Sequence, residues 1–206
     1  MTDLQSVLGL SCLAGQGRPV DFTLTKETAM KLYVSPRAPN PRRVTMFIAE
    51  KNIEGIEEVI VNLSENEHKT AAYVARNPFS GVPTLELDDG RVLSESRAIC
   101  TYLEGLHPQP NLMGTSFEER AFIEMADRRM ELALFGAVAN CIRHTHPGLS
   151  ALEQPQFHDF GQSQGEKMLV VAHWLDQHLA SSNTLPVTDS PSPTSRHFVR
   201  WNSPVV

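Results

Sequence analysis

Two kinds of hydrophobic spacing divide the chain into two parts. Between residues 30 and 106, short apolar runs typical of buried strands alternate with stretches that repeat apolar residues every three or four positions, as one helix face does. The predicted strands are residues 31–34, 56–63, 84–87 and 91–93, and the predicted helices are residues 40–53, 67–76 and 94–106. This β-α-β-α-β-β-α order predicts an α/β domain.

From residue 117 onwards the apolar positions follow helical spacing. The segment His107-Pro108-Gln109-Pro110 favours neither helix nor strand, so residues 107–116 are predicted to form a linker. The pair Pro147-Gly148 then breaks the helical pattern. The predicted helices are residues 117–144 and 164–179. They indicate an all-α second domain over residues 117–185.

Composition narrows the classes of function. The chain has 206 residues, and its 41% hydrophobic content is enough for one or two small cores. A net charge of −6 without a basic stripe argues against nucleic acid as a partner. No apolar run approaches the ~20 residues of a membrane-spanning helix, so no membrane partner is predicted.

Cysteine and histidine positions argue against disulfide and metal frameworks. Cys12, Cys100 and Cys141 are odd in number and widely spaced, which fits free thiols in a reducing cytoplasm. His144 and His146 are two positions apart and would face different sides of a helix. A cytoplasmic location and no metal site are therefore predicted.

The stretch from Phe79 to Ile99 carries the clearest candidate chemistry. Asp88-Asp89-Gly90 signals a hairpin turn between two predicted strands, because Asp and Gly tolerate positive φ. Ser94-Glu95-Ser96 then opens a helix, whose free N–H groups and positive dipole end can hold a carboxylate. Glu95 offers a negative charge to an amine. This corner would suit a ligand that carries both groups, such as the α-amino-acid end of a peptide.

Together, Gly81-Val82-Pro83, the hairpin and Glu95-Ser96 resemble the glutathione site of the cytosolic glutathione S-transferases. The resemblance implies a cis bond before Pro83 and pairing of the Val82 backbone with the cysteinyl part of glutathione. It also places Glu95 and Ser96 on the γ-glutamyl end. The alternative is an ordinary hairpin followed by a capped helix.

The loop before the first predicted helix is where the resemblance places the thiol chemistry. Its Pro-Asn-Pro-Arg-Arg-Val run is similar to the bacterial nu-like group, which implies that Asn40 faces the glutathione sulfur. Asn40 could instead cap the helix, with Pro41 at the first helical position. Ser35 is an alternative hydroxyl for the sulfur or an ordinary loop serine. Ala38 stands where the nu-like group has a hydrogen-bond donor. Lys69 falls where many relatives contact the glycyl carboxylate, although it could be a solvated charge.

The resemblance covers Met30 to Glu104 and implies a thioredoxin-like N-terminal domain followed by a truncated glutathione transferase helical domain. The implied reaction is conjugation of the glutathione thiolate to small electrophiles, a detoxification chemistry with glutathione as co-substrate. Relatives are homodimers, so a homodimer is expected. Two alternatives stay open: a glutathione-dependent disulfide reductase, and a non-catalytic glutathione-binding or partner-binding domain.

Both ends of the chain depart from the family pattern. Residues 1–29 lack periodicity and are expected to be a disordered extension; Lys26-Glu27 can be encoded by AAG-GAG, similar to a ribosome-binding sequence, so a natural start at Met30 is one hypothesis. Residues 186–206 form an irregular tail rich in Pro, Ser and Thr. In a shifted frame, Pro186 through Ser195 can encode a Ser-x-x-Asp capping box. We therefore predict a frameshifted tail rather than a natural one, which would leave apolar helix faces uncovered.

Overall fold

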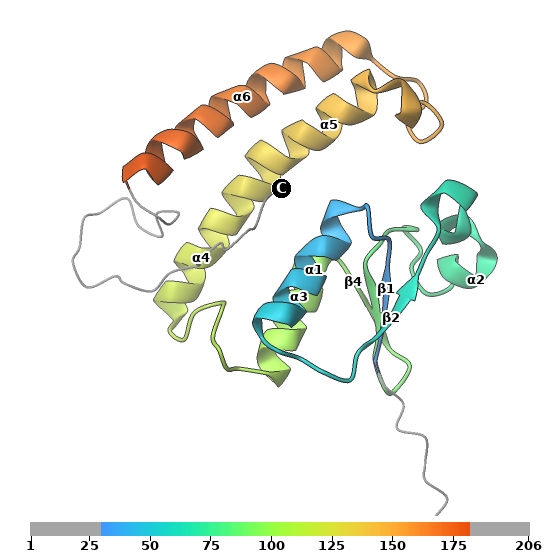
Figure 1. Cartoon of the computed structure of the whole chain (residues 1–206), viewed down its shortest axis with the longest axis vertical. Helices are drawn as coiled ribbons and strands as arrows, with labels where there is room; N and C mark the ends of the chain where they lie inside the picture. The colour runs from blue at the N-terminus through green and yellow to red at the C-terminus, as the bar shows by residue number, and fades with distance from the viewer. Residues whose placement is uncertain (1–29, 182–206) are drawn as a thin grey trace, which may run out of the picture.

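The short apolar runs form a four-stranded sheet (Figure 1). The computed structural model describes residues 30–181, so the extension, start-site, tail and frameshift predictions lie outside the described residues. The strands are β1 (Lys31–Val34), β2 (Glu57–Ile60), β3 (Thr84–Glu86) and β4 (Val92–Ser94), in the order β2-β1-β3-β4. β1 is parallel to β2 and antiparallel to β3, which is antiparallel to β4.

Side chains alternate along β1 and so contribute to two cores. In Figure 1, α1 (Pro39–Glu50) and α3 (Ser96–Leu106) cover one face of the sheet, and α2 (Ala71–Val74) lies on the other side. Leu32 and Val34 pack in the cluster that includes residues of α1 and α3, whereas Tyr33 packs in the cluster that includes Tyr73 of α2. The larger core contains Leu32, Val34, Val44, Ile53, Leu85, Leu87, Ile99, Cys100 and Leu103. The smaller core contains Tyr33, Val61 and Tyr73.

The prediction that Asn40 caps the first helix is wrong. α1 begins at Pro39, and its N-cap is Ala38, which is extended at φ −86° and ψ 134° and provides no side-chain cap. A residue that precedes proline is pushed to this conformation by steric contact with the proline ring. Pro41 is tolerated in the first turn because the N–H it lacks has no intrahelical acceptor there. Asn40 therefore occupies the second helical position.

The polar segment after β2 is not the single helix predicted over residues 67–76. It forms two 3₁₀ turns, η1 (Leu63–Glu65) and η2 (Glu67–Lys69), followed by α2. The side chain of Asn62 accepts a hydrogen bond from the Ser64 N–H, and that of Thr70 accepts one from the Tyr73 N–H. Each of these local bonds starts a separate short turn, and together they compete with the backbone bonds of one continuous helix.

Two long antiparallel helical segments form the second part of the chain (Figure 1). The first runs through α4 (Phe117–Arg129), a π-helical segment η3 (Met130–Phe135) and α5 (Gly136–Thr145), and a capping box between Ser116 and Glu119 starts it. A 3₁₀ turn η4 (Pro147–Leu149) leads to the second, α6 (His158–Ser181). Among the described helices, none has the length and apolar character needed to cross a bilayer.

α6 begins six residues before the predicted start at Gln164. This first part of the helix was not predicted because it contains Gly161, which weakens the helical signal. The structure shows why glycine is suited to the position: a Cβ there would lie 2.7 Å from Thr145 Cγ2 and 2.9 Å from His144 Cβ on α5. Gly161 thus permits the close approach of α6 to α5.

A buried lysine fixes the linker to the first domain. Lys51, at the end of α1, has a fully buried side chain, and its ammonium lies 2.8 Å from Glu104 Oε2 on α3. It also donates to the carbonyl oxygens of His107 at 2.6 Å and Pro110 at 2.7 Å. The linker predicted over residues 107–116 therefore begins with a segment held by a paired charge.

Candidate functional site

The sheet register gathers the predicted site residues around one end of the sheet. Thr84 at the start of β3 pairs with Ser94 at the end of β4 and with Tyr33 near the end of β1. The segment that precedes β3 therefore meets the segments that follow β1, β2 and β4 at this end of the sheet. They carry Ser35, Asn40, Lys69, Val82, Glu95 and Ser96.

The loop before β3 presents an unpaired stretch of backbone. The Val82–Pro83 peptide bond is cis, as the sequence predicts. Within residues 30–181, neither the N–H nor the C=O of Val82 has a hydrogen-bond partner. Because unpaired backbone of this kind can bind an extended peptide as a strand edge does, the loop offers a docking edge.

The residues that open α3 are not used to cap it. Glu95 is exposed and occupies the N-cap position, but its side chain makes no cap hydrogen bond. The first three N–H groups of α3, from Ser96 to Ala98, have no partner among the described residues. The alternative of an ordinary capped helix therefore does not fit, and the helix N-terminus is open to a carboxylate.

Glu95 also has a costly backbone conformation. Its φ is +69° and its ψ is 114°. Positive φ is uncommon outside glycine, and such conformations cost on the order of 1–3 kcal/mol and cluster at functional sites.

Arg43 connects the first domain, the Ser96 hydroxyl and the helical domain. It lies one turn after Asn40 on α1, and its Nη1 donates to Ser96 Oγ at 3.2 Å. Its guanidinium also lies 3.9 Å from Asp127 and 3.6 Å from Glu131. Since Ser96 accepts from Arg43, its own O–H remains available to donate to an anion. Arg43 is not among the residues predicted from the sequence, although its spacing of three from Asn40 places both on one helix face.

The two candidates for orienting a sulfur differ in exposure. Asn40 is exposed, and because Pro39 and Pro41 lack an N–H, it alone of these three residues has a backbone N–H, which has no partner within residues 30–181. Ser35 is buried, and its carbonyl oxygen accepts from the Ala38 N–H at 3.0 Å. The geometry thus favours Asn40 as the group that a ligand can reach.

The η2 turn carries one exposed cation and one buried imidazole. Lys69 is exposed, whereas His68 is 8% exposed and its Nδ1 has no partner among the described residues. Burial, and then the charge of Lys69, lower the pKa of His68 below its usual value, so the ring is neutral at pH 7. No local signal in the sequence indicates the burial of His68, because this burial depends on the tertiary fold.

We expect His68 to make stability depend on pH below neutrality. The folded protein binds its proton less readily than the unfolded chain, so its contribution to unfolding free energy is complete above pH ~6.5 and declines as the pH falls below that value. In urea unfolding at about pH 7.5 and 5.5, wild type should lose more stability than His68→Gln, which cannot titrate. Equal losses in the two proteins would contradict this assignment.

Burial argues against Cys100 as the reactive group. Cys100 and Cys141 are free thiols, and burial raises the pKa of Cys100 to about 12, so that thiol stays protonated. Within residues 30–181, the structure contains no group of three or more His, Cys, Asp or Glu side chains arranged to hold a metal ion.

Comparison with known proteins assigns the chain to a family. The sequence profile described as the glutathione S-transferase N-terminal domain matches residues 38–106. A glutathione S-transferase domain-containing protein from Marinobacter aquaeolei is 37% identical, and its structure matches with a TM-score of 0.72 over 78% of each chain. The chain belongs to the glutathione S-transferase family. This family pairs a thioredoxin-like domain with a helical domain, so the predicted family and fold class are both confirmed.

Two curated members of the family show the extent of the match. Glutathione S-transferase 2 of Saccharomyces cerevisiae is 37% identical over 149 residues, which are 71% of this chain and 64% of that protein. Maleylacetoacetate isomerase of Pseudomonas aeruginosa is 33% identical over 158 residues, 76% of this chain and 69% of that protein. The chain therefore spans about two thirds of the length of these relatives.

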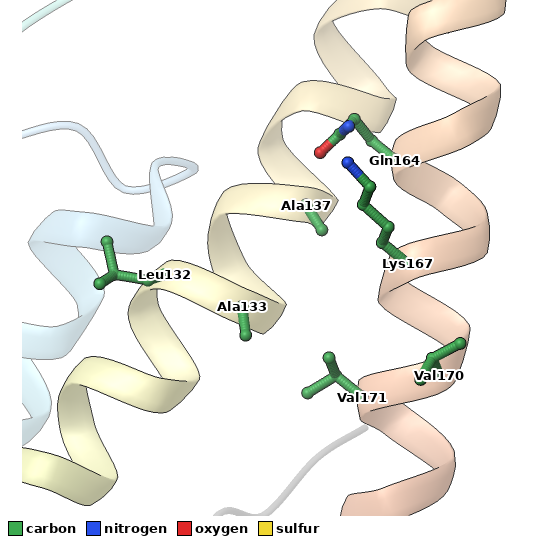
Figure 2. A pocket seen from close by; sticks show the side chains of 7 residues that line it. All are labelled: Leu132, Ala133, Ala137, Gln164, Lys167, Val170 and Val171. Atoms are coloured by element: carbon green, nitrogen blue, oxygen red, sulfur yellow. The ribbon is translucent and has the colours of Figure 1, made fainter.

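The helical domain has an open groove that is separate from the predicted glutathione residues. Its volume is about 420 Å³, and Figure 2 shows Ala133 and Ala137 on one wall opposite Gln164, Lys167 and Val171 of α6. Leu132 and Val170 also line the groove, and both side chains are exposed. No predicted glutathione residue lines the groove.

Proposed function

We propose that the protein binds glutathione and transfers its thiolate to small electrophiles. Val82 pairs with the cysteinyl backbone, Glu95 and Ser96 bind the γ-glutamyl end, and Lys69 binds the glycyl carboxylate. Asn40 orients the sulfur, with Ser35 as the alternative. The observation that carries this proposal is the meeting, at one end of the sheet, of unpaired Val82 backbone with the uncapped N-terminus of α3.

The charges of the site match those of glutathione. Glu95 can accept from the α-ammonium group, while the N–H groups of α3 and the Ser96 hydroxyl can donate to the adjacent α-carboxylate. At the far end of the tripeptide, the Lys69 ammonium is available to the glycyl carboxylate. Family membership adds to this argument, since relatives carry the name glutathione S-transferase.

The reaction needs a thiolate held near a donor. The Asn40 N–H and its side-chain amide can both point a hydrogen bond at the sulfur, which stabilises the anion. The thiolate sulfur then attacks the electrophilic carbon, a carbon–sulfur bond forms, and the leaving group departs with its electron pair. The neutral Asn40 amide does not take the thiol proton, so solvent receives it.

Two further candidates follow from particular observations. A glutathione-dependent disulfide reductase is favoured by the nu-like loop around Asn40. A non-catalytic glutathione-binding domain is favoured by Ala38, which cannot donate to a sulfur, and by the exposed apolar faces of the helical domain.

Binding and turnover measurements on the purified chain separate these candidates. We expect glutathione to bind in a calorimetric titration, and an aryl halide to be conjugated with release of halide. Turnover of a disulfide substrate but not of the halide would favour the reductase. Binding without either turnover would favour the non-catalytic domain, and no binding would contradict all three.

The protein is also proposed to act in the cytoplasm as a homodimer. Phe79 supports an intermolecular contact, because its side chain is 88% exposed next to the Val82 loop. Burying one such ring contributes about 1.5–3 kcal/mol, so Phe79→Ser should raise the dimer dissociation constant at least ~10-fold in sedimentation equilibrium. Leu152→Ser, at an exposed site after α5, serves as the control and should leave it unchanged. An unchanged constant in the Phe79 variant would contradict this interface.

A further inference from the structure

Three buried side chains surround the carbonyl oxygen of Gly81. Tyr73 Oη donates to this oxygen at 2.7 Å, Asn77 Nδ2 donates at 3.0 Å, and Thr84 Oγ1 lies 3.2 Å away. Thr84 is 0% exposed, Asn77 3% and Tyr73 4%. We refer to these three side chains as the Gly81 cradle.

The protons of the cradle can be assigned to one closed ring. Asn77 Oδ1 accepts from the Phe79 N–H at 3.1 Å, which turns its two amide hydrogens toward Gly81 and Thr84. The single Tyr73 proton goes to the Gly81 oxygen at the shortest distance. Thr84, 3.1 Å from Tyr73, then accepts from Asn77 and donates to Tyr73. Burial raises the pKa of Tyr73, so its phenol keeps the proton that it donates.

The cradle fixes more than the carbonyl group. The Gly81 C=O and the Val82 N–H belong to one peptide unit, which is planar and trans, so the two groups point in opposite directions. Two strong donors on the Gly81 oxygen therefore set the direction of the Val82 N–H. That N–H points away from the cradle and is unpaired within the described residues.

We propose that Tyr73, Asn77 and Thr84 are positioning residues, which hold the Gly81–Val82 peptide plane so that the Val82 N–H faces the backbone of bound glutathione. The proposal rests on glutathione being the ligand of this site. Hydrogen bonds weaken steeply as the donor angle falls, so a rotation of this plane would weaken binding without touching the ligand.

Substitutions that remove one hydroxyl group test the proposal in the full-length protein. Tyr73→Phe and Thr84→Val each remove a hydroxyl and keep the shape of the side chain, whereas Thr84→Ser keeps the hydroxyl. Tyr33→Phe is the matched control, because Tyr33 contacts Tyr73 edge-on in the same core but donates to Glu86 instead of Gly81. Glutathione affinity by calorimetry, turnover at saturating glutathione and urea unfolding are measured for each.

We expect Tyr73→Phe and Thr84→Val to weaken glutathione binding about 5- to 10-fold, the loss expected for one misdirected hydrogen bond. Turnover at saturating glutathione should change by less than about 2-fold, and Tyr33→Phe and Thr84→Ser should bind nearly as wild type does. Stability should fall by similar amounts in Tyr73→Phe and Tyr33→Phe, which separates positioning from general destabilisation.

Two different patterns would overturn the proposal. If wild type binds glutathione and Tyr73→Phe binds it equally well, or no worse than Tyr33→Phe does, the cradle does not position Val82. If wild type fails to bind, the glutathione assignment itself is wrong and the cradle proposal fails with it.

Discussion

Glutathione affinity should fall at least ~10-fold when Glu95 is replaced by glycine, while the fold becomes no less stable. The loss arises because Glu95 supplies the negative charge for the ligand ammonium, and charged hydrogen bonds contribute about 1.5–3 kcal/mol. Stability should hold or rise, because glycine adopts the φ of +69° at this position without strain. Calorimetry and urea unfolding measure the two effects separately.

Two further variants make the Glu95 experiment specific. Glu95→Gln keeps the size of the side chain and removes its charge, and should lose most of the same affinity. Asp88→Asn removes an equal charge from the exposed hairpin turn and should bind glutathione as wild type does. Wild-type affinity in Glu95→Gln would show that the carboxylate does not bind the ammonium group.

The largest loss of stability is expected for Lys51→Met. The substitution would leave Glu104 without its partner at 2.8 Å and would remove the donor to the carbonyl oxygens of His107 and Pro110. Removing one member of a buried ion pair typically costs about 3–5 kcal/mol, a large share of the ~5–15 kcal/mol that stabilises a domain. Urea unfolding at neutral pH should show this loss as a lower midpoint.

An exposed ion pair provides the control for Lys51. Arg91 pairs with Asp89 at 2.7 Å, but its side chain is 77% exposed, so Arg91→Met should lower the urea midpoint far less than Lys51→Met does. The double variant Lys51→Met, Glu104→Leu should recover part of the loss, because no buried charge is then left unpaired. Similar losses in Lys51→Met and Arg91→Met would refute a special role for the buried pair.

Local signals in the sequence were sufficient to predict the elements at the end of the sheet that carries the site. The strand over residues 31–34 is found as predicted, and Asp88-Asp89-Gly90 forms the turn, with Gly90 at φ +82°. Helix α3 begins at Ser96, within the predicted opening. These features depend on alternation and turn chemistry over a few residues, so the sequence specifies them without reference to the rest of the fold.

Features that depend on contacts between distant residues could not be predicted. The bond from Arg43 to Ser96 joins α1 to α3, the bond from Tyr73 to the Gly81 carbonyl oxygen joins α2 to the loop before β3, and the burial of His68 depends on the turns around it. The start of α1 was misplaced because Ala38-Pro39 and Asn40-Pro41, two residues apart, both put a proline where a helix can begin. In the site itself, the predicted residues were brought together, whereas the groups that orient them were not foreseen.

The π-helical segment Met130–Phe135 affects how homologous sequences should be aligned with this chain. A π-turn closes a hydrogen bond over one residue more than an α-turn, so the segment acts as a one-residue insertion in an otherwise continuous helix. A homologue with a regular helix here would require a single-position gap within the segment. Without that gap, each residue of α5 would be compared with one that faces about 100° away around the helix, and substitution patterns there would be misread.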